Sequence, residues 1–189
     1  MIRPRNKQET QLAKKYVATK AQNLPFHKCF ANENWFDSHD LTSVYVSKVM
    51  PSGKICFCMY LIDKGCLGLK STILYINAEP GDFEEFVDQG YQREGRDYVE
   101  ITPSQAHNII FGGIDYAEEC GFAPMDKDWR ITERFLNEDL ITDEIDDIEF
   151  GKDGKPFYLS GPYDNVSKVL STLRKNFGED GFFYTPPPF

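Results

Sequence analysis

The residues best suited to chemistry lie in the stretch GCLGLK, residues 65–70. A thiolate is a strong nucleophile, and nearby cations lower the pKa of a thiol. Cys66 lies between Lys64 and Lys70, so the pattern is compatible with a hydrolase or transferase that uses Cys66 as its nucleophile. The two glycines of the stretch also suit an ordinary connection between strands, because glycine takes positive φ angles without steric cost. We favour the connection and keep the enzyme as the alternative.

A cysteine nucleophile also needs a base, and the chain has three histidines, His27, His39 and His107. The sequence places none of them to serve Cys66, and no local signature of a known cysteine hydrolase surrounds the thiol. His107 falls in the first turn of a predicted helix, where we expect a half-exposed packing residue. The candidate catalytic residues are therefore Cys66, Lys70 and His107.

A metal site could be built from the cysteine and histidine side chains. The candidates are His27, Cys29, Cys56, Cys58 and Cys66. Zinc sites usually pair ligands across two to four intervening residues on a turn, whereas Cys56 and Cys58 lie inside an apolar run. We therefore expect packed core thiols, no metal and no cofactor. A phosphate-binding loop is not expected either, because no helix that starts with Lys-Ser/Thr follows the glycines of residues 65–68.

Two adjacent glycines, Gly112 and Gly113, interrupt the apolar stripe of a predicted helix. Each glycine costs about 1 kcal/mol of helix stability relative to alanine, so we expect another group to approach the helix closely there. A neighbouring strand is the favoured party, and a ligand is the alternative. Together with Lys64 and Gly68, these two glycines are the candidate binding residues.

The charge of the chain is unevenly distributed. The net charge is −9, and residues 1–28 carry seven bases against one acid, so the rest of the chain has a net charge of −15. The segment 138–149 contains seven acidic residues and no base, which is typical of a solvated acidic loop. The bases of the first segment are spread out and have few interleaved aromatic residues, which is a weak nucleic-acid signal. We expect no nucleic-acid binding, and the basic start could instead pair with the acidic segment.

The composition suits one soluble cytoplasmic domain. With 189 residues and 41% hydrophobic content, the chain can bury a single core, and we treat 1–189 as one domain. The start is charged where a secretory signal would need an apolar run, and no stretch approaches about 18 apolar residues, so we expect no membrane association. Five cysteines, mostly inside apolar runs, suit reduced buried thiols and a cytoplasmic location.

The elements that must position the candidate residues begin with a basic helix at about 7–22, where apolar residues recur at helical spacing. Two extended runs, 42–50 and 54–62, flank the turn 51–53 and predict a hairpin. Both faces of the second run are apolar, which is typical of a central strand covered on both sides. A third strand, 71–77, is predicted after the GCLGLK stretch.

The best-marked element is a helix from Thr102 to Cys120. Its start, Thr102-Pro103-Ser104-Gln105, is a capping box, and Gly121 supplies a stop. The remaining predicted elements are a short helix that opens at Pro80, a polar loop at 89–97, a hairpin of 148–150 and 157–159 around Asp153-Gly154, a helix at 165–177 and an edge strand at 182–184. This order predicts an α+β fold, with a mainly antiparallel sheet of hairpins covered by helices.

The stretch GCLGLK and the helix end YAEECGFAP, residues 116–124, resemble segments of bacterial proteins of unassigned function. Those proteins share a Cys-Leu-Gly-x-Lys turn after a hairpin and a Tyr-Ala-x-x-x-Gly-Phe-x-Pro helix end. In the similar chains an acidic residue follows the lysine, where this chain has Ser71. The resemblance implies no activity. We therefore predict a non-enzymatic binding or regulatory module with a possible protein partner, and the alternative is an enzyme that uses Cys66.

Overall fold

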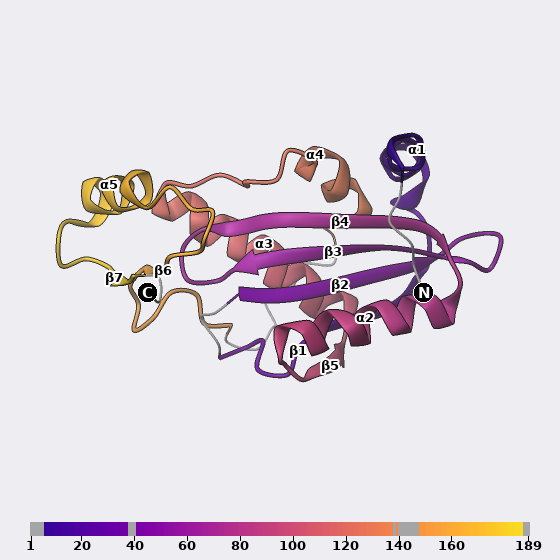
Figure 1. Ribbon diagram of the computed structural model, residues 1–189, viewed down its shortest axis with the longest axis horizontal. Helices are drawn as coiled ribbons and strands as arrows, with labels where there is room; N and C mark the ends of the chain where they lie inside the picture. The colour runs from indigo at the N-terminus through magenta and orange to yellow at the C-terminus, as the bar shows by residue number, and fades with distance from the viewer. Residues whose placement is uncertain (1–5, 38–40, 138, 140–147, 187–189) are drawn as a thin grey trace.

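Four consecutive runs rich in β-branched and aromatic residues form the first four strands of one sheet (Figure 1). The computed structural model describes residues 6–37, 41–137, 139 and 148–186 of the chain. Within these residues the sheet has five strands in the order β4-β3-β2-β1-β5, and its neighbours are all antiparallel. The strands are β1 (Phe26–Asn32), β2 (Leu41–Val49), β3 (Ile55–Asp63), β4 (Gly68–Ala78) and β5 (Tyr98–Ile101). The predicted α+β fold with an antiparallel sheet is confirmed.

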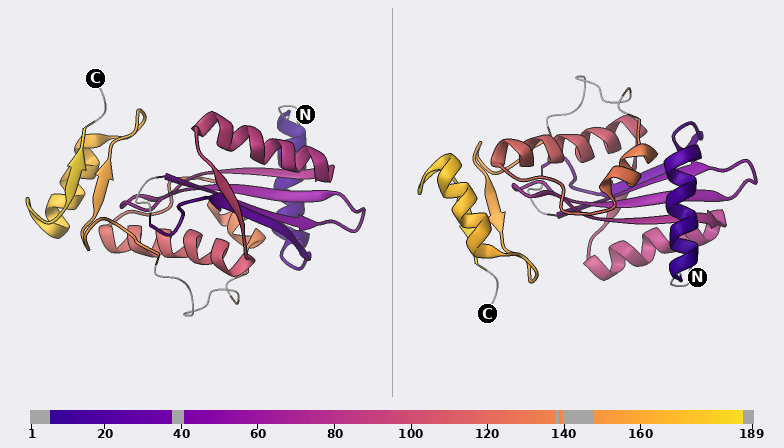
Figure 2. Two further views of the ribbon diagram at one scale, coloured as in Figure 1. Left: turned by 90° about the horizontal axis from the view of Figure 1, so that it is seen from below. Right: turned by 90° about the horizontal axis from the view of Figure 1, so that it is seen from above.

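Helices pack against both faces of the sheet (Figure 2). α3 (Pro103–Cys120) covers one face, and α2 (Pro80–Glu94) lies on the opposite face. The core on the α3 side includes Val44, Val46, Cys58, Tyr60, Ile62, Ile109 and Ile110, and the core on the α2 side includes Tyr45, Phe57, Phe83, Val87 and Tyr91. β3 contributes to both cores, as its two apolar faces predict.

The start and end of α3 follow their sequence signals. The Thr102 hydroxyl accepts a hydrogen bond from the backbone N–H of Gln105 (3.1 Å), and the Gln105 side chain accepts one from the backbone N–H of Thr102 (2.9 Å). Gly121 ends the helix with φ of 94°. This left-handed conformation favours glycine, so both helix boundaries could be predicted.

The N-terminal helix crosses one end of the sheet (Figure 2). It consists of α1 (Lys7–Tyr16) and a π-helical turn, η1 (Val17–Ala21), which confirms the predicted helix at about 7–22. The buried ammonium of Lys48 caps its C-terminal end by donating to the carbonyl oxygens of Ala21 (3.1 Å) and Gln22 (2.9 Å). Two further short elements, α4 (Trp129–Thr132) and η2 (Glu133–Phe135), contact η1.

The C-terminal residues form a small layer at the other end of the sheet (Figure 1). It contains β6 (Phe157–Leu159), α5 (Val166–Phe177) and β7 (Phe183–Thr185). The predicted hairpin is wrong in its pairing, because β6 pairs in parallel with β7, and the Asp153-Gly154 turn is closed only by the isolated bridge between Lys152 and Lys155. The turn itself is present, since Asp153 and Gly154 have φ angles of 49° and 73°.

The structure contains two strands that were not predicted, and two predicted loops were not confirmed. β1 and β5 were not predicted, and the expected polar loop at 89–97 is wrong because α2 continues to Glu94. The predicted acidic loop at 138–149 lies largely outside the described residues. Among the helices that the structure describes, none combines the length and apolarity needed to cross a bilayer.

Candidate functional site

The first three residues of the GCLGLK stretch belong to a buried turn between β3 and β4, and the last three begin β4. The carboxylate of Asp63 holds this turn by accepting hydrogen bonds from the backbone N–H groups of Cys66 (3.0 Å) and Leu67 (3.3 Å). Gly68 has φ of 65°, and a Cβ atom at this position would lie 2.7 Å from Ala117 Cβ on α3. Glycine is therefore required for both the turn conformation and the close approach to α3.

The thiol of Cys66 is fully buried in the turn. It packs in a cluster with Leu67, Cys120, Tyr158 and Leu173, which joins the turn to α3, β6 and α5. Burial is the largest effect on this group and raises the pKa of the Cys66 thiol far above its ordinary value, and the nearby carboxylate of Asp63 raises it further. A nucleophilic cysteine needs access and a lowered pKa, so the structure opposes the nucleophile interpretation.

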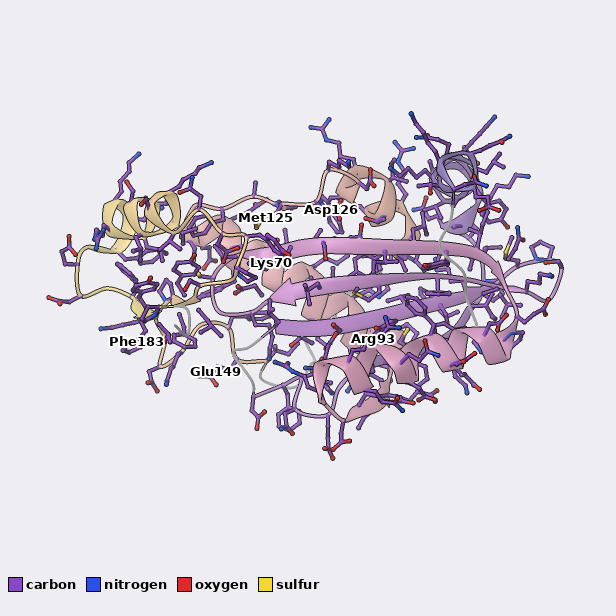
Figure 3. All side chains as sticks on the ribbon, viewed as in Figure 1. Lys70, Arg93, Met125, Asp126, Glu149 and Phe183 are labelled. Atoms are coloured by element: carbon purple, nitrogen blue, oxygen red, sulfur yellow. The ribbon has the colours of Figure 1, made fainter. Side chains whose placement is uncertain are left out.

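The two lysines that flank Cys66 have other partners. The ammonium of Lys64 is buried and donates to the carbonyl oxygen of Trp35 (2.5 Å). The ammonium of Lys70 forms an ion pair with Asp164 (2.7 Å), whose side chain is only 4% exposed. Lys70 therefore ties β4 to the C-terminal layer, and its position at that end of β4 is labelled in Figure 3.

The carboxylate of Asp164 is organised by more than the lysine. It also accepts hydrogen bonds from the backbone N–H of Gly161 (2.9 Å) and from the hydroxyl of Tyr158 (3.3 Å). Burial alone would raise the pKa of Asp164, but the hydrogen bond from Lys70, the N–H of Gly161 and the lysine charge together lower it. Lys70 and Asp63 also line a small cavity of about 90 Å³ at this junction. The arrangement is that of a structural ion pair.

His107 is a buried histidine of α3, which corrects the expectation of a half-exposed residue. Its Nδ1 lies 2.5 Å from the carbonyl oxygen of Pro103, and its Nε2 accepts a hydrogen bond from the backbone N–H of Asn137 (2.8 Å). These partners require a neutral ring with its proton on Nδ1. Burial is the main cause that lowers the pKa of His107, which agrees with the neutral form.

The three catalytic candidates do not converge on one pocket. His107 lies in the first turn of α3, whereas the turn that contains Cys66 packs beside Gly113 and Ala117. Ten residues of helix separate His107 from Ala117, which corresponds to about 15 Å along the axis. The thiol also lacks access to solvent, so the geometry does not support a Cys66 nucleophile with His107 as its base.

The paired glycines of α3 face other parts of the protein. A Cβ atom at Gly113 would lie 2.5 Å from the Cγ2 methyl of Ile62 on β3, and one at Gly112 would lie 2.6 Å from the ring of Phe150. The favoured prediction that a strand approaches Gly113 is confirmed. The candidate binding residues Lys64, Gly68, Gly112 and Gly113 thus serve packing contacts. Among the described residues, no His, Cys, Asp and Glu side chains gather in a group of three or more that could hold a metal.

A cavity lies elsewhere, between α2 and the strands β2, β3 and β4. This cavity, the α2–β4 groove, has a volume of about 530 Å³. Its floor is formed by the strand residues Tyr45, Met59, Ile73 and Tyr75, and its α2 wall carries Glu85, Phe86, Gln89, Arg93 and Glu94. Figure 3 labels Arg93 at the C-terminal end of this wall. An apolar floor with a few polar groups on its wall is the usual composition of a binding site.

The α2–β4 groove was not predicted from the sequence, although one signal for it exists. β4 alternates apolar and polar residues only weakly, and the apolar pair Ile73 and Tyr75 falls on one face of an edge strand. Ile73 remains 39% exposed. A partly exposed apolar face on an edge strand is a signal for an uncovered surface, but only the position of α2 turns it into a groove.

Comparison of the chain with protein-family models, with curated proteins and with solved structures found no match. The resemblance of the GCLGLK turn and of the α3 end to bacterial proteins of unassigned function stays a prediction.

Proposed function

We propose that this chain is a non-enzymatic binding module for a protein partner, and that the α2–β4 groove receives an apolar segment of that partner. The observation that supports this proposal most directly is the exposed apolar floor of the groove. Ile73 is 39% exposed on the edge strand β4, next to the partly buried ring of Tyr75. Figure 1 shows this face of β3 and β4 without a helix in front of it.

α2 covers only part of the sheet face on which it lies. Its residues Phe83, Val87 and Tyr91 are at most 1% exposed and pack against the sheet, whereas Phe86 is partly buried and lines the groove. The floor near Ile73 lies beyond its reach and stays open to solvent. Covering apolar surface gains about 25 cal/mol per Å², so a partner side chain placed in the groove stabilises the complex.

The charge on the groove wall favours a basic partner segment. Within residues 80–94, α2 carries five acidic residues and one basic residue, Arg93. Glu85 and Glu94 belong to the wall of the groove, and the whole chain has a net charge of −9. Complementary charge speeds association and orients the partner. The expected segment therefore combines apolar side chains with Lys or Arg.

A peptide library displayed on phage tests this proposal directly. Selection against the full chain should enrich peptides that carry apolar residues together with Lys or Arg. Synthetic copies of these peptides should bind Ile73→Glu at least tenfold more weakly than the wild type, because the substitution places a charge on the apolar floor.

Leu159→Glu is the matched control for this experiment. Leu159 is an aliphatic residue on β6 with 42% exposure, close to the 39% of Ile73, and it lies in the C-terminal layer. Circular dichroism melts should show that both variants fold. The proposal is wrong if no selected peptide distinguishes Ile73→Glu from Leu159→Glu.

A further inference from the structure

β4 is an edge strand whose two faces belong to different cores. Ile73 and Tyr75 face the α2 side and line the α2–β4 groove. Leu74 and Ile76 face the α3 side and pack against that core. Alternation of this kind is the normal geometry of a strand, and it leaves the outer backbone edge of β4 between the two faces.

The first part of this outer edge is covered by the segment that follows α3. The backbone N–H of Met125 donates to the carbonyl oxygen of Leu69 (2.9 Å). The carboxylate of Asp126 accepts from the backbone N–H of Thr72 (2.6 Å) and from its hydroxyl (3.2 Å). Figure 3 shows Met125 and Asp126 alongside this end of β4. The carbonyl oxygen of Leu69 and the N–H of Thr72 on this outer edge therefore both have hydrogen-bond partners.

The next outward-facing residue, Leu74, is left open. Because the N–H of Thr72 points away from β3, the N–H and carbonyl groups of Leu74, two residues later, point outward as well. No residue in the described part of the chain forms a hydrogen bond with these two groups. Unpaired edge groups of this kind are a template for another strand.

A second cavity gives access to this open edge. It has a volume of about 340 Å³ and lies between α1 and α4, and its lining includes Ala13, Leu74 and Ile131. An ion pair between Lys14 and Asp128 (2.7 Å) joins the two helical walls. We name this cavity the α1–α4 groove. It shares Ile73 and Tyr75 with the α2–β4 groove, so the two grooves flank the same edge of β4.

The geometry points to strand addition: an extended segment of the protein partner pairs with the β4 edge at Leu74 and places alternate side chains in the two grooves. This inference rests on the proposed function, because it assigns a binding mode to the same site. An extended segment suits both features, since its backbone pairs with the N–H and carbonyl of Leu74 and its side chains alternate between two faces. A helical segment would fill one groove and leave the edge unpaired.

Backbone methylation of a selected peptide tests this mode. Each amide of the synthetic peptide is N-methylated in turn, which removes one donor and blocks one pairing position. Strand addition predicts at least tenfold weaker binding when the methyl group is on the amide that donates to the carbonyl oxygen of Leu74, and little change at the amides on either side of it. Tolerance at every position, or a period that matches a helix, would overturn strand addition.

Amide hydrogen exchange of the full chain supplies the second readout. On peptide binding, the amide of Leu74 should exchange at least tenfold more slowly, whereas the amide of Ile73, which faces β3, should change much less. Unchanged exchange at Leu74 would also overturn strand addition. If the same peptide still requires Ile73, the groove remains a binding site and only the strand mode is wrong; if no peptide requires Ile73, the proposed function is wrong as well.

Discussion

The close approach of α3 to β3 predicts that Gly113→Leu destabilises the fold. Leucine raises helix propensity by about 0.8 kcal/mol relative to glycine, so the change would be stabilising in an isolated helix. In this protein, however, the Cβ atom alone would lie 2.5 Å from the Cγ2 methyl of Ile62. Overpacking of a core usually costs about 1–3 kcal/mol. Ile62 is fully buried, so a shift of its methyl group would disturb other core side chains. We therefore expect the upper end of this range and a net loss of about 2 kcal/mol.

Thermal and urea unfolding measure this effect. For a chain of this size, a loss of about 2 kcal/mol lowers the Tm by roughly 4–8 °C. A double-mutant cycle with Ile62→Ala identifies the contact, because truncating Ile62 makes room for the new side chain. The double variant should be more stable than the sum of the two single effects predicts, by about 1 kcal/mol or more. An unchanged or raised Tm for Gly113→Leu would refute the close-approach argument.

Three further predictions concern buried ionisable groups. Cys66 should react with iodoacetamide more slowly than a free thiol, because burial raises its pKa; a Cys66-specific rate above that of a free thiol at pH 6, absent in Cys66→Ser, would restore the nucleophile. Burial lowers the pKa of Lys48 to about 8 from 10.5, so the unfolded chain holds this proton over a pH range in which the folded protein has released it. The stability of the wild type relative to Lys48→Met should therefore rise between these two pH values in urea unfolding, and a constant difference would contradict the burial argument. Lys70→Met should cost about 3–5 kcal/mol, because it leaves the buried carboxylate of Asp164 without its cation; a variant that unfolds at the wild-type urea concentration would show that the ion pair is dispensable.

Local sequence signals predicted the elements that depend on few distant contacts. The hairpin of β2 and β3 follows from a turn between two apolar runs, and the ends of α3 follow from its capping box and from Gly121. The turn conformation of GCLGLK also follows from glycine, since Gly68 has positive φ. These features are encoded within a few residues of where they occur.

Other elements depend on contacts that the sequence does not display. β5 has only four residues and exists as the partner of β1, with Ile101 opposite Cys29. α2 passes through Gly90, which lies in the predicted loop 89–97; a glycine fits there because the hydroxyl of Tyr45 occupies the space that a side chain would need. His107 looked half exposed because its partner, the backbone N–H of Asn137, lies 30 residues away.

The candidate site was predicted least well, for the same physical reason. The GCLGLK stretch contains reactive residue types, but packing of α5 and β6 against the turn buries the thiol. The α2–β4 groove contains no unusual residue type at all. It arises from the place where α2 stops covering the sheet, and no local sequence pattern specifies that place.

The strand order also has a consequence for synthesis of the chain. β1 to β4 pair with their neighbours in sequence, whereas β5 must return to the free edge of β1. During translation, this edge of β1 stays unpaired while about 50 residues emerge between the end of β2 and the end of β5, which takes roughly 3 to 10 s at 5–20 residues per second. An open strand edge can pair with another nascent chain. The pairing of β5 with β1 therefore closes a period in which the unfinished chain is vulnerable to aggregation on the ribosome.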